Sequence, residues 1–72
     1  MKKINKTKIK INGKKYKINP KMTLKEAIAK FKIPIDKVAI ELNENIVDKK
    51  KLDKIKVQNN DKIEIVHFIG GG

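Results

Sequence analysis

Three consecutive glycines, Gly70, Gly71 and Gly72, directly follow a segment with the character of a β-strand. Glycine has no side chain and adopts positive φ freely, so a glycine tail can pass through a narrow channel. Such a tail can present the Gly72 carboxylate to the active site of another protein, while Gly71 and Gly70 give it access. A frayed end, a linker remnant or a cloning scar would be the alternative. Scars usually carry Ser, His or protease-site residues, which the tail lacks, so we expect it to be functional.

The rest of the chain has little chemistry of its own. It contains no Cys, which excludes a disulfide framework, a thiolate metal site and a nucleophilic thiol. The single histidine, His67, has no second ligand or nucleophile nearby, so we expect neither a metal site nor a catalytic triad. A chain of 72 residues forms one small domain with little room for a deep catalytic cleft. This size favours a binding or carrier module over an enzyme.

The net charge of +11 raises nucleic acid as a partner. All nineteen basic residues are lysines, however, and arginine is the residue that reads phosphate and guanine in a bidentate manner. The lysines are spread along a chain that is also rich in Ile and Asn, which indicates a compositional drift that fills solvated positions with lysine. We therefore do not expect nucleic-acid binding, and the lysines can instead steer association with an acidic partner surface.

The sequence contains no apolar stretch long enough to span a membrane and no signal peptide. We therefore expect a cytoplasmic protein that does not bind membranes and is monomeric on its own.

A β-hairpin is predicted over residues 9–18. Asn12-Gly13 suits a type I′ turn, because both central positions of that turn need a positive φ. Apolar residues and lysines alternate on either side of the turn, which places one face toward a core and the other in solvent. The residues expected on the apolar face are Ile9, Ile11, Tyr16 and Ile18.

An amphipathic helix is predicted over residues 24–32. Thr23 and Glu26 have the spacing of a capping box, in which each side chain bonds the backbone N–H of the other residue. Pro34 is expected to end the helix. One stripe of the helix is apolar and should pack on the sheet; it consists of Leu24, Ala27, Ile28 and Phe31.

Three further strands and a helical turn complete the predicted fold. In chain order they are a strand over 38–42, a short edge strand at 46–47, a helical turn within 48–56 and a final strand over 62–68. One helix covering one face of a sheet is a two-layer α+β domain. We expect a single domain over residues 1–69, with residues 1–8 as an extension within the first strand and residues 70–72 as a flexible tail.

The final strand presents two different faces. Ile63 and Ile65 share one parity and should face the helix, whereas Val66 and Phe68 should lie on the opposite face. Large apolar residues on an exposed sheet face often mark a partner site. We therefore expect Val66 and Phe68, together with the adjacent Ile69, to form a partner interface.

The order of elements, the strand from Lys62 to Ile69 and its ending in three glycines resemble the ThiS family of ubiquitin-like sulfur carriers. The turn at 11–13, the helix start at 23–26 and the segment 38–47 are also similar to that family. Asn60 replaces a glycine usual there, and Glu44 stands where glycine or another turn residue is common. The resemblance covers the chain from about Ile9 onward and implies a β-grasp fold with a mixed sheet of four to five strands.

The resemblance also implies a reaction sequence. A ThiF-like adenylyltransferase would consume ATP to adenylate the Gly72 carboxylate, and a cysteine desulfurase or another persulfide donor would then supply sulfur. The resulting thiocarboxylate would donate its sulfur to a ThiG-like thiazole synthase in thiamine biosynthesis. The protein would be a co-substrate that binds no cofactor, rather than an enzyme.

Three other functions remain open from the sequence. A sulfur carrier for molybdopterin synthesis and a ubiquitin-like protein modifier would use the same tail. A basic nucleic-acid-binding β-grasp module would not need the tail. Removal of Gly71 and Gly72 therefore separates the first two functions from the third.

Overall fold

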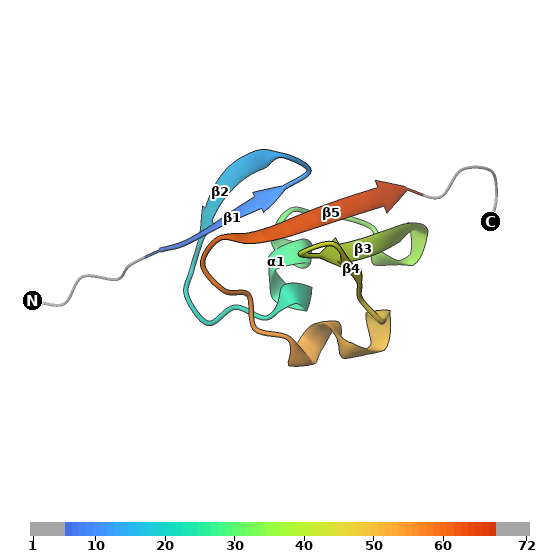
Figure 1. Cartoon of the computed structure of the whole chain (residues 1–72). Helices are drawn as coiled ribbons and strands as arrows, with labels where there is room; N and C mark the ends of the chain where they lie inside the picture. Colours follow the sequence, from blue (N-terminus) through green and yellow to red (C-terminus); the bar gives the residue numbers. More distant parts are fainter. Residues whose placement is uncertain (1–5, 68–72) are drawn as a thin grey trace, which may run out of the picture.

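A computed structural model describes residues 6–67 of the chain (Figure 1). Phe68, Ile69 and the three glycines, which the sequence analysis singled out, lie outside the described residues. The strands are β1 (Thr7–Ile11), β2 (Lys14–Ile18), β3 (Val38–Leu42), β4 (Asn45–Ile46) and β5 (Asp61–His67). The helices of this range are the α-helix α1 (Leu24–Lys30) and the 3-10 helices η1 (Ile35–Lys37) and η2 (Lys49–Lys54).

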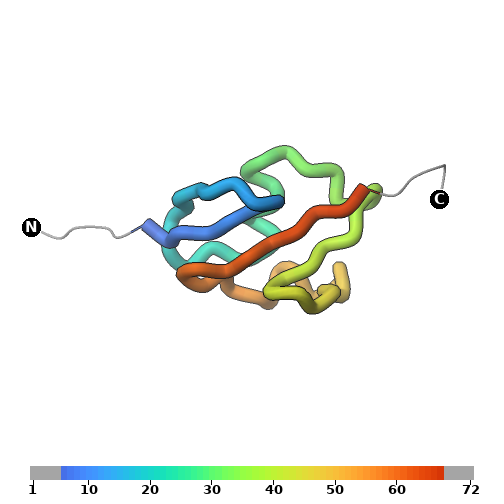
Figure 2. Tube along the Cα trace, turned by 45° about the horizontal axis from the view of Figure 1, so that its top comes forward, coloured from blue at the N-terminus to red at the C-terminus, as the bar shows by residue number. Residues whose placement is uncertain are grey.

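The five strands form one mixed sheet in the order β2-β1-β5-β3-β4. β5 pairs in parallel with β1 and antiparallel with β3, so the last strand within residues 6–67 lies in the middle of the sheet. Figure 2 shows β1 and β5 running side by side, with β3 on the other side of β5. This architecture is the mixed sheet with one main helix that the sequence predicted.

β1 and β2 form the predicted hairpin. Asn12 and Gly13 have φ of 49° and 83°, so both turn positions lie in the left-handed region that a type I′ turn requires. β1 begins at Thr7, two residues before the start predicted at Ile9. The predicted apolar face points inward: Ile9, Ile11 and Ile18 are buried and Tyr16 is half-buried.

The capping box at the start of α1 is present as predicted. The Thr23 N–H donates to Glu26 Oε1 at 2.8 Å, and the Glu26 N–H donates to Thr23 Oγ1 at 3.1 Å. The backbone hydrogen bond from Thr23 is the main cause that lowers the pKa of Glu26, and the hydrogen bond from the Thr23 hydroxyl adds to it. The reciprocal bonds satisfy two backbone donors that the first turn of a helix leaves without partners.

The prediction that α1 extends to Lys32 and is ended by Pro34 was wrong, because the helix ends at Lys30. Lys32 has φ of 57°, a left-handed conformation that stops the helix before proline can act. The backbone N–H groups of Lys32 and Ile33 donate to carbonyls of the helix, in the pattern of a Schellman motif. These bonds are Lys32 to Ala29, 3.0 Å, and Ile33 to Ile28, 3.4 Å.

The connection between α1 and β5 mostly follows the prediction. η2 is the predicted helical turn; its Leu52 is buried, and Asp48 caps it by accepting from the Lys50 N–H at 3.0 Å. β4 lies at Asn45–Ile46, one residue before the predicted pair, and η1 has no counterpart in the prediction.

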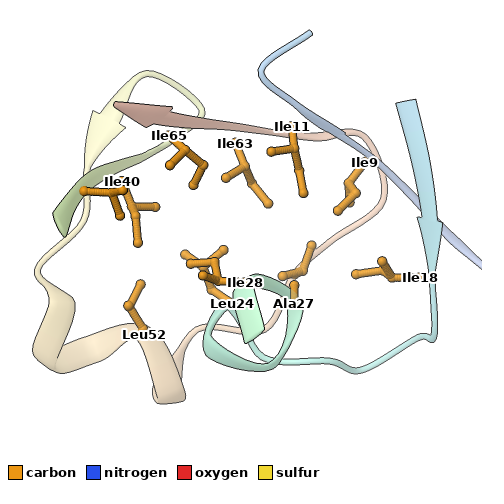
Figure 3. Packing of buried hydrophobic residues seen from close by; sticks show 12 residues of the cluster. Ile9, Ile11, Ile18, Leu24, Ala27, Ile28, Ile40, Leu52, Ile63 and Ile65 are labelled. Carbon is orange, nitrogen blue, oxygen red and sulfur yellow. The ribbon is translucent and has the colours of Figure 1, made fainter. Parts of the chain in front are cut away.

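The core lies between the sheet and a second layer formed by α1 and η2. In Figure 3, isoleucines of β1 and β5 point toward Leu24, Ile28 and Leu52. The ring of Phe31 packs against the ring of Tyr16 with centroids 4.7 Å apart, which closes the core at the hairpin. The largest fully buried side chains are Ile18, Leu24, Ile28, Val38, Ile40, Leu52 and Ile63.

We expect Ile28→Asp to abolish cooperative thermal unfolding. Ile28 is 1% exposed at the centre of the core, and an unpaired carboxylate there costs several kcal/mol or more, a large share of about 5–15 kcal/mol of total stability. Ala29→Asp is the matched control, because Ala29 is the next residue of α1 and is exposed. Circular dichroism should show a cooperative transition for the control alone, and an Ile28→Asp variant that melts like the parent would contradict this packing.

Candidate functional site

The strand that leads to the three glycines is held in the middle of the sheet. β3 stays paired with β5 up to the last described residue, where Val38 lies opposite His67. β1 pairs with β5 only over the first part of the strand, from Asp61 to Ile63. At its last described residue, His67, β5 is therefore held mainly by β3.

The side chain of Asn12 extends the support that β1 gives to β5. The Ile65 N–H donates to Asn12 Oδ1 at 2.7 Å, and Asn12 Nδ2 donates to the Ile65 carbonyl at 3.2 Å. The Asn12 backbone N–H also donates to the Ile63 carbonyl at 2.9 Å. The side-chain amide of Asn12 thus continues the backbone hydrogen bonding of β5 at Ile65, beyond the last residue that pairs with β1.

The start of β5 is fixed by a second set of polar contacts. Asp61 is buried, and its carboxylate accepts hydrogen bonds from Asn43 Nδ2 at 2.9 Å and from the Gln58 N–H at 2.7 Å. Asn43 also bonds the backbone of Lys62 through both its N–H, at 2.7 Å, and its Oδ1, at 2.9 Å. These contacts fix the register of β5 at its start, and the pairing with β3 and the bonds of Asn12 fix it further along the strand.

The outer face of the sheet, opposite α1, exposes two large apolar side chains, here called the apolar group: Val66 near the end of β5 and Ile46 on the edge strand β4. Val66 is 51% exposed, as its parity predicted, and lies opposite Ala39 of β3. Ile46 of β4 is 78% exposed and lies opposite Glu41, which in turn lies opposite Glu64. Opposed residues of antiparallel strands share a face, so Val66, Ala39 and Ile46 lie on one face around the two glutamates.

This arrangement can bind a partner but does not resemble a catalytic centre. Residues 6–67 contain no group of three or more His, Cys, Asp or Glu side chains that could hold a metal ion. His67 is exposed at the end of β5. None of the helices in this range combines the length and the apolar character needed to cross a lipid bilayer.

Of the predicted partner interface, Val66 lies on the outer face, and its role as a partner contact stays a prediction. Phe68, Ile69 and the glycines lie outside the described residues. Sequence reasoning missed Ile46 as an outer-face residue and missed the bonds of Asn12 to Ile65. The second contact had no local signal, because Asn12 and Ile65 are far apart in the sequence and Asn-Gly is explained by the turn alone.

Comparison with known proteins gives a consistent result. The chain matches the ThiS family over residues 4–72. It is 32% identical to the sulfur carrier protein ThiS of Bacillus subtilis, over 89% of this chain and 98% of that protein. It is also 38% identical to a thiazole synthase of Paramagnetospirillum magneticum, over 90% of this chain. The chain spans only 20% of the length of that thiazole synthase.

A solved structure has the same fold. The crystal structure of the thiamine biosynthesis protein ThiS from Geobacter metallireducens superimposes with a TM-score of 0.81. The match covers 92% of this chain and 100% of that protein, at 25% sequence identity.

We expect Asn12→Gly to loosen β5 at Ile65 while it preserves the turn. Glycine accepts the positive φ of this position, so the variant removes only the side-chain amide and costs about 1–3 kcal/mol of stability. Hydrogen exchange of the Ile65 amide should become faster than in the parent. Asn12→Asp keeps an acceptor for the Ile65 N–H but no donor for its carbonyl, so it should be intermediate. Unchanged Ile65 protection in Asn12→Gly would contradict this role.

Proposed function

This chain belongs to the ThiS family, and we propose that it carries sulfur, as a thiocarboxylate on Gly72, to thiazole formation in thiamine biosynthesis. It is a small carrier protein and not a catalyst. It therefore acts as a protein co-substrate that other enzymes modify and consume.

The observation that carries this proposal is the position of β5. β5 is held between β1 and β3 and tied further by Asn12, and in the sequence two residues, Phe68 and Ile69, separate it from Gly70. A folded domain with three glycines at the end of the sequence suits a carrier that offers its terminal group to several active sites. Val66 of the apolar group lies next to His67, the last described residue of β5, and we propose this group as a docking surface.

The chemistry requires activation, because a free carboxylate is a poor electrophile. A carboxylate oxygen of Gly72 attacks the α-phosphorus of ATP, which forms an acyl-adenylate and releases pyrophosphate. The terminal sulfur of a cysteine persulfide then attacks the acyl carbon and expels AMP. A second thiol cleaves the resulting S–S bond and is itself oxidised to a disulfide, which leaves the thiocarboxylate on Gly72.

The proposed partners supply these steps. A ThiF-like adenylyltransferase binds ATP, and a cysteine desulfurase or another persulfide donor brings the sulfur, so the carrier itself binds no cofactor. A ThiG-like thiazole synthase accepts the sulfur. The similarity of this chain to part of a thiazole synthase supports that acceptor over molybdopterin synthesis or protein modification. All of these steps are proposed to take place in the cytoplasm.

We expect Gly71→Leu to prevent adenylation without changing the fold. A leucine side chain next to Gly72 should block entry of the tail into the narrow channel of the activating enzyme. The measurement is ATP–pyrophosphate exchange with the adenylyltransferase of the same organism, alongside thermal unfolding of the variant. Exchange at the parental rate would contradict the assignment of the tail.

We expect Val66→Glu to weaken binding to the adenylyltransferase by about tenfold or more, because a charge on the exposed apolar group would be buried at the interface. Ala29→Glu adds the same charge on α1, in the layer on the other side of the sheet, and serves as the control. Isothermal titration calorimetry measures both affinities. Equal affinities of Val66→Glu and the parent would place the docking surface elsewhere.

A further inference from the structure

The outer face of β2, β1 and the start of β5 carries a cluster of lysines, here called the lysine face. Its members are Lys8, Lys10, Lys15, Lys17 and Lys62. The strand register places Lys8 opposite Lys17 and Lys10 opposite Lys15 across the hairpin. Lys10 is also the partner of Lys62 on β5, so the cluster crosses three adjacent strands.

Within the described residues, few acidic groups face the lysines: Glu64 lies two residues from Lys62 on the same face of β5, and Glu44 pairs with Lys62. In the described part of the chain, the one ion pair of the lysine face joins Lys62 to Glu44 at 3.4 Å, and both side chains are substantially exposed. An exposed pair of this kind contributes little. Like charges directly opposite each other on a sheet destabilise it. Within the isolated domain, four of these lysines lie opposite one another across the hairpin, whereas an acidic partner surface would attract them.

The lysine face is hollowed, and Glu64 separates it from Val66 of the apolar group on the outer face. An open groove of about 630 Å³ lies along this face, lined by the five lysines, Asn60, Ile9 and Tyr16. Along β5, Lys62 lies on the same face as Glu64 and Val66, because alternate residues of a strand share a face. At about 3.3 Å per residue, Lys62 lies roughly 17 Å from His67. One partner that receives the tail can therefore cover both surfaces.

We propose that the lysine face docks on an acidic surface of the adenylating enzyme, beside the channel that receives the tail. The inference rests on the proposed function and names the part of the carrier that provides electrostatic attraction to that enzyme. Complementary charge of this kind raises the rate of encounter and fixes orientation. Binding along the sheet then aligns β5 with the channel.

Side-chain chemistry favours a protein surface over nucleic acid. The chain has no Arg, the residue that binds phosphate in a bidentate manner. Binding of single strands uses exposed aromatic rings for base stacking. Tyr16, the aromatic residue of β2, lies on the opposite face and packs against Phe31. The lysine face thus offers charge without the groups that read or stack bases.

The test compares two charge-reversal variants of the complete chain in adenylation by the enzyme of the same organism. Lys10→Glu/Lys17→Glu places each new carboxylate opposite a remaining lysine, Lys15 or Lys8, so cross-strand attraction should preserve the fold. Lys25→Glu/Lys51→Glu changes the net charge equally on exposed positions of α1 and η2 and is the control. Initial rates are measured between about 0.01 M and about 0.15 M ionic strength, where the Debye length falls from about 30 Å to about 8 Å.

The parent KM should rise with ionic strength while kcat stays constant. At low ionic strength, Lys10→Glu/Lys17→Glu should raise KM about tenfold or more, and the control should raise it less than about threefold. Equal KM values for the two variants would overturn the inference while adenylation of the parent upholds the proposed function. Retention of a fluorescent single-stranded oligonucleotide by the parent, with no separation of the KM values, would assign the face to nucleic acid and also overturn it. Failure of the parent to form any adenylate would overturn the proposed function, and this inference with it.

Discussion

β5 is hydrogen-bonded on both sides, in parallel to β1 and antiparallel to β3, and the rest of the molecule is arranged around that strand. Its inward residues Ile63 and Ile65 are buried in the core and face α1. Its outward residues divide the opposite face into a lysine-rich part and an apolar part. The contacts that fold the domain therefore also hold the strand that precedes the glycines in the sequence.

The two faces of the sheet have separate tasks in so small a domain. Burial of one large apolar side chain contributes about 1.5–3 kcal/mol, and the inner face with α1 and η2 supplies most of these side chains. The outer face contributes little to folding, since it exposes Val66 and Ile46 and opposes lysines across the hairpin. That face is therefore free to serve binding, which suits the carrier role proposed above.

Local patterns in the sequence predicted most of the fold because they have local causes. The Asn12-Gly13 turn, the capping box of Thr23 and the parity of Val66 each depend on a few neighbouring residues. The end of α1 was misplaced because Pro34 is an obvious stop signal, whereas the left-handed conformation of Lys32 has none in its residue type.

The features of the site that the sequence did not reveal depend on contacts between distant segments. The amide of Asn12 meets Ile65 only after β1 and β5 have paired. The facing of Lys10 with Lys62 likewise depends on the parallel register of these two strands. Alternation alone predicts that these lysines are in solvent, but it does not predict that they gather on one hollowed face.

The most direct test of sulfur transfer is the intact mass of the protein after incubation with its adenylyltransferase, ATP, a persulfide donor and thiol. We predict a mass increase equal to the replacement of one oxygen by one sulfur, and fragmentation should place it on Gly72. An unchanged mass, while the same enzyme preparation forms the acyl-adenylate, would contradict the role of this protein as a sulfur carrier.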